Sequence, residues 1–211
     1  MAKSLEIIMP YFLDNIFYNL NRFKRLIGLL KTQLWYKIFL KKVGANSRIY
    51  NPMTISNPSK ILIGRNVIIR DYSRLEVIGD GQLNIGDNVS IEQSLSIVCA
   101  ETLNIGANTT ISFRVMITDV EHSYAEISKH ILKQSNKVFS TSIGDNCFIG
   151  AGVCILAGTI LGKQCIVGTN SVVRGEFPDY SVIVGSPAKI VKRYDFIQNT
   201  WRKTDTHGNF I

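Results

Sequence analysis

An aliphatic residue recurs at every sixth position through much of this sequence. Neither the helical period of about 3.6 residues nor the strand period of two accounts for a strict six, but a triangular solenoid does, with one short strand and one corner per hexad. Three hexads then make one coil of eighteen residues. The sequence predicts an all-β solenoid, a parallel β-helix. Two unbroken runs are Ile105, Ile111 and Ile117, and Ile143, Ile149, Ile155, Leu161, Val167 and Val173.

A second repeat, Ile-Gly followed by two polar residues, marks successive coils. It begins at Ile63, Ile85, Ile105 and Ile143, with the variant Leu161-Gly162-Lys163-Gln164, at intervals of 22, 20, 38 and 18 residues. The excess over eighteen indicates four inserted residues near 79–81, two near 100–101 and twenty at about 123–142. The longest insertion directly follows His122, and long excursions from rigid scaffolds commonly carry binding or catalysis.

Small or branched residues four places after the aliphatic positions suit an inward corner with little room. They are Val67, Ser73, Val89, Thr109, Val115, Cys147, Val153, Thr159, Cys165 and Ser171. Cys147 and Cys165 are one coil apart and should stack. We interpret both as core filling rather than redox or nucleophilic groups, because a buried free cysteine behaves as a small hydrophobe.

The 211 residues suffice for one main domain with appendages. We divide them into a basic amphipathic helical segment at 1–45, a β-helix at 46–193 and a short extension of uncertain structure at 194–211. The first segment holds eight basic and two acidic residues, so it carries +6 of the net +8. Because the remainder is nearly neutral, we expect no nucleic-acid partner.

Within residues 1–45, apolar side chains recur at spacings of three and four, which favours a helix. They are Phe12, Ile16, Leu20, Phe23, Ile27, Leu30, Leu34 and Ile38. Trp35, Tyr36 and Phe39 lie among lysines, which is consistent either with contact to an anionic inner membrane surface or with packing on the β-helix or a neighbouring subunit. Four cysteines without CxxC spacing, no signal-peptide pattern and no long apolar run favour the cytoplasm.

The hexad repeat followed by Gly185-Ser186-Pro187-Ala188-Lys189-Ile190-Val191-Lys192 resembles the hexapeptide-repeat acyltransferases, and most closely the bacterial sugar O-acetyltransferases. The resemblance covers about residues 46–193. It implies a left-handed parallel β-helix, a homotrimer, and clefts between subunits that bind acetyl-CoA and a sugar or a cell-surface polysaccharide precursor.

In this family the catalytic histidine ends a coil just before an extended loop, the position that His122 occupies. Acetyl transfer needs a base of near-neutral pKa close to the acceptor hydroxyl, and histidine suits that task. His122 is therefore the predicted general base. Asp119 and Glu121 are candidates to orient its imidazole, with Asp119 also on the acceptor side, although each is equally consistent with an ordinary exposed carboxylate.

The resemblance assigns further positions to the two substrates. Phe148 replaces a family tryptophan, and Glu92 aligns near a family asparagine, so both departures bear on the acceptor. The residues expected around the CoA arm are Gly150, Ala151, Gly168, Thr169, Arg174 and Gly175, with structural glycine as the competing interpretation. Lys189 and Lys192 are expected near the CoA phosphates, or form a solvated basic end.

Three other functions remain open on the same scaffold. An N-acetyltransferase of an amino sugar would differ only in the acceptor atom. A γ-type carbonic anhydrase needs three metal-binding histidines on successive coils, a distribution that His122, His130 and His207 lack, so we expect no metal site. A non-enzymatic binding solenoid would have no reason to carry a histidine at a long insertion.

Overall fold

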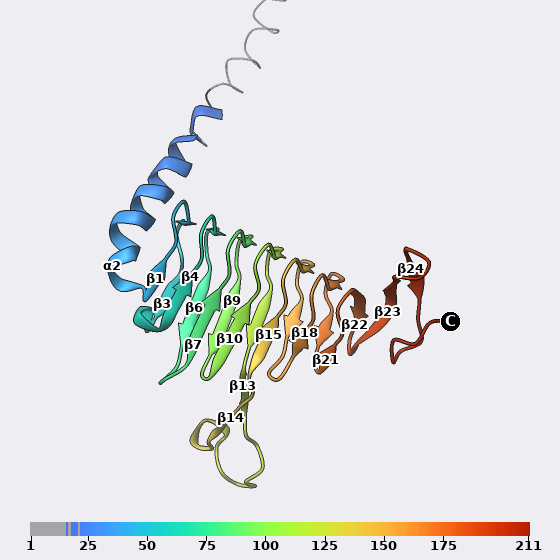
Figure 1. Ribbon diagram of the computed structural model, residues 1–211. Helices are drawn as coiled ribbons and strands as arrows, with labels where there is room; N and C mark the ends of the chain where they lie inside the picture. Colours follow the sequence, from blue (N-terminus) through green and yellow to red (C-terminus); the bar gives the residue numbers. More distant parts are fainter. Residues whose placement is uncertain (1–15, 17, 21) are drawn as a thin grey trace, which may run out of the picture.

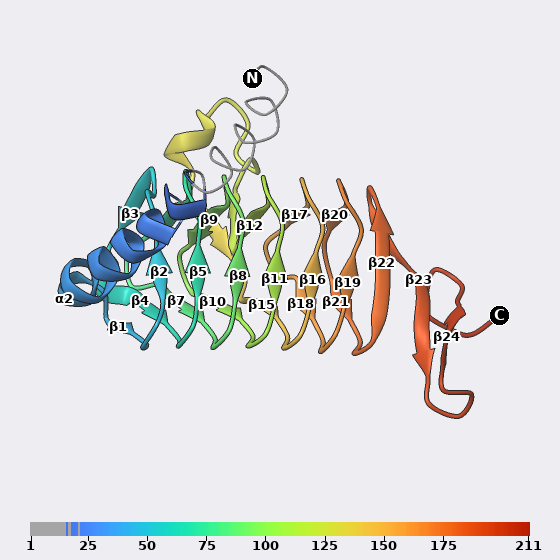
Figure 2. The same cartoon turned by 90° about the horizontal axis from the view of Figure 1, so that it is seen from above.

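The computed structural model describes residues 16, 18–20 and 22–211. It shows a solenoid of about seven turns, in which successive coils add strands to three parallel sheets (Figures 1 and 2). The expected parallel β-helix is confirmed.

The sheets are named by the order in which the chain visits them. The first holds β1 (Lys42–Val43), β4 (Ile61–Ile63), β7 (Gln82–Ile85), β10 (Thr102–Ile105), β15 (Thr141–Ile143), β18 (Ile160–Leu161) and β21 (Glu176–Phe177). The second holds β2 (Arg48–Ile49), β5 (Ile68–Ile69), β8 (Ser90–Ile91), β11 (Thr110–Ile111), β16 (Phe148–Ile149), β19 (Ile166–Val167) and β22 (Ser181–Gly185). The third holds β3 (Thr54–Ser56), β6 (Arg74–Val77), β9 (Ser96–Cys99), β12 (Met116–Thr118), β17 (Cys154–Ile155) and β20 (Val172–Val173).

The strand register follows the hexad repeat. Ile105 pairs with Ile143 in the first sheet, and Ile143 pairs with Leu161 one coil later. These side chains are buried, as are the small residues expected at the inward corners. One continuous apolar core therefore runs along the axis of the solenoid.

The polar residue that ends each Ile-Gly block makes the corner. Asn66, Asn88, Asn108 and Asn146 have φ between 57° and 59°, in the left-handed region that asparagine tolerates better than most residues. Their amides also stack, because Asn66 Nδ2 donates to Asn88 Oδ1 at 3.0 Å and Asn88 Nδ2 to Asn108 Oδ1 at 3.0 Å. The preceding glycine permits close approach of coils: a Cβ on Gly144 would lie 2.5 Å from the carbonyl oxygen of Gly162.

The cysteines at the core confirm the core-filling interpretation. Cys147 and Cys165 are buried one coil apart, and Cys147 Sγ lies 3.2 Å from the carbonyl oxygen of Gly162. The hydrogen bond to Cys165, together with burial, raises the pKa of Cys147. Burial, reinforced by the charge of Asp119, raises the pKa of Cys99 to about 12. Neither Cys99 nor Cys147 is primed as a thiolate nucleophile.

Both ends of the solenoid carry additional elements. Residues 22–31 are helical and continue through a π-helical turn, η1 (Thr32–Tyr36), into α2 (Lys37–Phe39), so the expected helix is confirmed where it is described. Positions 1–15, with Phe12, lie outside the described residues. The first coil already begins at β1, before residue 46. No helix in the described part of the chain is long and apolar enough to cross a membrane.

At the other end, β22 pairs antiparallel with β23 (Ala188–Asp195), which pairs antiparallel with β24 (Thr200–Lys203). This hairpin crosses the expected boundary at residue 193 and gives structure to much of the extension. Tyr194 and Trp201 face each other across it, with ring centroids 5.6 Å apart.

Candidate functional site

The long loop of the solenoid lies where the chain passes from the third sheet to the first. The connections at this place comprise 57–60, which includes the short helix η2 (Pro58–Lys60), then 78–81, 100–101, 119–140, 156–159 and 174–175. We call this line the third-to-first edge, and residues 119–140 the His122 loop. The sequence placed this loop at about 123–142, but it leaves directly after β12 and Thr141 already belongs to β15. Figure 1 shows it projecting from the middle of the solenoid.

Two antiparallel strands form the stem of the His122 loop. They are β13 (Val120–His122) and β14 (Asn136–Val138), and His122 lies directly opposite Asn136. The His122 side chain is exposed at the end of β13. An exposed imidazole on a short, paired strand is available to a substrate and held by a rigid stem.

The tip of the loop is ordered by a glutamine. Gln134 is 7% exposed, its Nε2 donates to the carbonyl oxygens of Glu126 and Lys129 at 3.0 Å, and its Oε1 accepts the Glu126 N–H at 3.0 Å. His130 Nδ1 accepts the N–H of Leu132 at 3.2 Å and so caps η3 (Ile131–Lys133). His130 therefore has a local structural task that His122 lacks.

Asp119 anchors the base of the loop. It is completely buried, and its two carboxylate oxygens accept the backbone N–H groups of Ala100 and Glu101 at 2.7 and 2.9 Å. Both oxygens are occupied by the preceding coil. Asp119 therefore holds the base of the loop, and its burial contradicts the alternative of an ordinary exposed carboxylate. Its role toward the acceptor or the imidazole stays a prediction.

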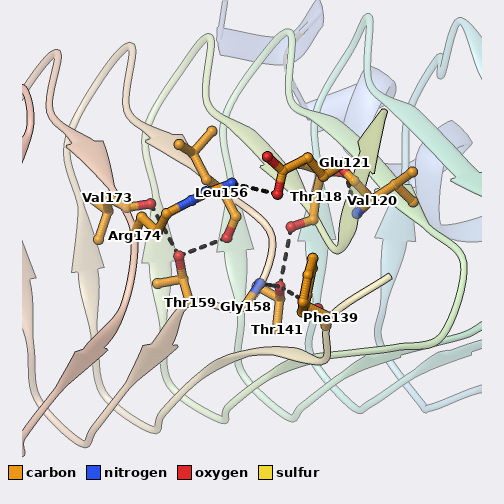
Figure 3. A network of polar contacts seen from close by, with 10 residues as sticks. All are labelled: Thr118, Val120, Glu121, Phe139, Thr141, Leu156, Gly158, Thr159, Val173 and Arg174. Carbon is orange, nitrogen blue, oxygen red and sulfur yellow. Dashed lines mark hydrogen bonds and ion pairs between the residues drawn. The ribbon is translucent and has the colours of Figure 1, made fainter. Parts of the chain in front are cut away.

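Thr141 closes the base from the other side (Figure 3). Its Oγ1 donates to the carbonyl oxygen of Thr118 at 3.1 Å and accepts the N–H of Gly158 at 3.1 Å. The carbonyl oxygen of Phe139 accepts the same Gly158 N–H at 3.3 Å. The two ends of the loop are thus tied to each other and to the following coil.

An ion pair fixes the strand that carries His122. Arg174 Nη2 lies 2.9 Å from Glu121 Oε2, and the two residues are 53 positions apart in the chain (Figure 3). Arg174 directly follows β20 on the third-to-first edge, two coils beyond β12. The structure thus brings Arg174, a predicted CoA residue, to the residue beside His122. The sequence could not predict the contact between Arg174 and Glu121, because it depends on how the coils stack.

The other predicted residues fall at two further places. Glu92 follows β8 and pairs with Arg70 at 2.9 Å, and Phe148 begins β16 and is 47% exposed, so both lie on or beside the second sheet. Gly150, Ala151, Gly168 and Thr169 follow β16 and β19, at the edge where the second sheet passes to the third. Lys189 and Lys192 are exposed on β23. In a single chain the predicted site is therefore divided between two lines of turns, one where the chain enters the third sheet and one where it leaves that sheet.

The glycines differ in the space around them. A Cβ on Gly150 would lie 2.7 Å from the backbone nitrogen of Thr169, and one on Gly168 would lie 2.7 Å from Val184 Cγ1, so both serve close packing between coils. Gly175 has φ +104° and open space where a Cβ would be. Gly175 lies beside Arg174 on the edge that carries the His122 loop, with open space on its Cβ side.

Known proteins supply an independent comparison. A family model described as the hexapeptide repeat of succinyl-transferase matches residues 140–174. The putative lipopolysaccharide biosynthesis O-acetyl transferase WbbJ of Escherichia coli K12 is 35% identical over 195 residues, which cover 88% of this chain and 95% of that protein. The chain belongs to the hexapeptide-repeat acetyltransferases.

Another relative of this hexapeptide-repeat acetyltransferase has the name of an amino-sugar acyltransferase. The dTDP-4-amino-4,6-dideoxy-D-glucose acyltransferase of Escherichia coli is 31% identical over 71% of this chain and 80% of its own length. Among solved structures, the N-acyltransferase AntD from Bacillus cereus, in complex with dTDP and coenzyme A, superimposes with a TM-score of 0.70 at 21% identity, covering 81% of this chain and 92% of that one. The structural likeness supports the fold.

Proposed function

We propose that this enzyme transfers the acetyl group of acetyl-CoA to a hydroxyl group of a sugar, with His122 as the general base. The observation that carries the proposal is the exposed His122 at the end of a braced hairpin, in a chain 35% identical to a putative O-acetyl transferase over nearly its whole length. The name of that relative also supports a lipopolysaccharide or related cell-surface polysaccharide precursor as the acceptor.

The reaction requires a general base, hydrogen-bond donors for the oxyanion and correct positioning of the base. His122 takes the proton of the acceptor hydroxyl as its oxygen attacks the thioester carbonyl, and then gives that proton to the departing CoA thiolate. Hydrogen-bond donors stabilise the oxyanion of the tetrahedral intermediate. The stem of the loop holds the imidazole in place, which matters because a misplacement of about 1 Å can cost about a hundredfold in rate.

The His122→Ala variant tests the base directly. Release of CoA from acetyl-CoA is measured with a panel of sugars, polysaccharides and sugar nucleotides, and kcat should fall about 10²- to 10⁴-fold. The matched control is His130→Asn on the same loop, which keeps an acceptor for the Leu132 N–H and should retain activity. Full activity of His122→Ala would remove His122 from this role.

N-acetylation of an amino sugar is the second candidate, favoured by the names of the amino-sugar acyltransferase and of AntD. Both reactions use the same donor and differ in whether oxygen or nitrogen attacks the carbonyl. The same assay separates them, because turnover of amino sugars with no turnover of any hydroxyl acceptor would favour the N-acetyltransferase.

We also propose that three copies assemble in the cytoplasm, with active sites between neighbouring chains. The support is the distribution of the predicted site over both edges of the third sheet, since a neighbouring chain can complete each half. Light scattering should then give three times the chain's 23.6 kDa. A particle of monomer mass that is fully active would overturn the shared-site arrangement.

A further inference from the structure

The N-terminal helix packs on the solenoid through one narrow and largely polar face. Thr32 is completely buried, its Oγ1 accepts the N–H of Ile49 at 2.7 Å, and it donates to the carbonyl oxygen of Gly28 at 2.6 Å. Gln33 Nε2 donates to the carbonyl oxygens of Gly44 and Ser47 at 3.1 and 3.3 Å. These bonds satisfy backbone groups at the open end of the first coil, so this face is a cap.

The opposite face of the helix is apolar and exposed. Seven side chains spaced by three or four residues are between 39% and 71% exposed: Ile16, Leu20, Phe23, Ile27, Leu30, Leu34 and Ile38. At about 100° per residue, they centre roughly 165° from the mean direction of Gly28, Thr32 and Gln33, the residues of the cap face. We call them the outer apolar stripe. Figure 1 shows the helix extending away from the first coil, and the exposures of these side chains show that the solenoid leaves the stripe largely uncovered. A continuous exposed apolar stripe on a helix marks an interaction surface.

All charged residues beside this stripe are basic. Between positions 16 and 42 the sequence has seven basic and no acidic residues: Arg22, Lys24, Arg25, Lys31, Lys37, Lys41 and Lys42. Trp35 and Phe39 are exposed with ring centroids 5.3 Å apart, and aromatic side chains favour the boundary between lipid and water. Beside the helix, Arg22 and Arg25 line a hollow of about 740 Å³ with Arg48 of the first coil, and Phe23 of the outer apolar stripe is among its lining residues.

We infer that the outer apolar stripe binds the surface of an anionic phospholipid bilayer, with the helix parallel to that surface. The apolar side chains enter the headgroup boundary and the flanking lysines and arginines meet lipid phosphates. The helix therefore has two functions, capping the solenoid with its polar face and docking the enzyme with the opposite one.

Charge argues against a second copy of the chain as the occupant. Pairing two such stripes would bring two wholly basic helices together, and like charges at close range repel. The rest of the chain, positions 43–211, has 16 basic and 14 acidic residues, so it offers no strongly acidic body for the helix to bind. An anionic lipid surface matches both the apolar and the basic character of this helix.

Flotation of the full chain with vesicles tests the inference independently of catalysis. The protein should float with vesicles containing phosphatidylglycerol, float less at high salt, and remain behind with pure phosphatidylcholine. The variant Phe23→Ser/Leu34→Ser/Ile38→Ser should lower the partition coefficient at least about tenfold, because it removes three apolar anchors that do not contribute to the cap. Substituting Arg22, Lys24 and Arg25 by Gln should have a comparable effect.

The matched control is Ile197→Ser, which removes an apolar side chain that is 93% exposed at the other end of the solenoid. It should float like the wild type. The inference is overturned if the wild type binds neutral and anionic vesicles equally or binds neither. It is also overturned if the stripe variant keeps full binding, or if that variant changes only the oligomeric mass, which would make a second copy the occupant.

Discussion

Arg174 and Glu121 show how one contact can matter to function with little effect on stability. Their side chains are 53% and 31% exposed, and ion pairs of this kind typically stabilise a fold by about 0.2–1 kcal/mol. Glu121 is nevertheless the residue before His122, so the pair restrains the strand that presents the imidazole. We therefore treat Arg174 as a positioning residue.

Exchanging the two charges tests this role. Arg174→Gln should lower kcat about tenfold, because the strand of His122 loses its restraint, and should leave the KM for acetyl-CoA nearly unchanged. The reversed pair Glu121→Arg/Arg174→Glu should recover much of the lost kcat, since the contact is restored with opposite polarity. A raised KM for acetyl-CoA with no recovery in the reversed pair would return Arg174 to the predicted role at the CoA arm.

For individual site residues, the sequence predicted positions along the coils better than it predicted side-chain contacts. His122 could be placed at the end of a coil, because counting hexads locates the excursion that follows it. The partners of Asp119 and Arg174 could not be predicted. These partners lie one coil or more away. Which side chains of the loop turn inward depends on where the loop leaves its coil, after Thr118, and the repeat does not specify that point.

Among the elements, the strands followed directly from the repeat, since each hexad must place one aliphatic side chain in a shared core. The stem of the His122 loop did not, because three-residue strands such as Val120–His122 are too short to show a period of two. The helix was predicted from its apolar stripe, yet the structure buries the opposite face. Polar Thr32 and Gln33 are suited to that face because the end of a β-helix presents backbone hydrogen-bonding groups that apolar side chains cannot satisfy.

The arrangement of the whole molecule separates stability from chemistry. Each coil contacts its two neighbours, so the free energy of folding accumulates along the axis, and a connection that leaves the edge of a coil adds little to it. The six connections on the third-to-first edge differ from two to twenty-two residues in length without disturbing the stacking of the strands that they join. The His122 loop is thus the longest member of a series that the scaffold tolerates.

Shortening the His122 loop to the length of a shorter connection tests whether the loop contributes to catalysis but not to the stability of the solenoid. Replacing residues 120–139 with Gly-Asp leaves four residues between β12 and β15, as in the natural connection at 78–81, and keeps both Asp119 and Thr141. Because the anchors at Ala100, Glu101 and Thr118 survive, the variant should keep the wild-type circular dichroism and a cooperative melting transition. Its kcat should fall at least as far as that of His122→Ala, about 10²- to 10⁴-fold, because the base and its stem are both gone. A variant that folds and still acetylates would place the chemistry elsewhere on the solenoid, whereas one that fails to fold would show that the loop supports the coils as well as the reaction.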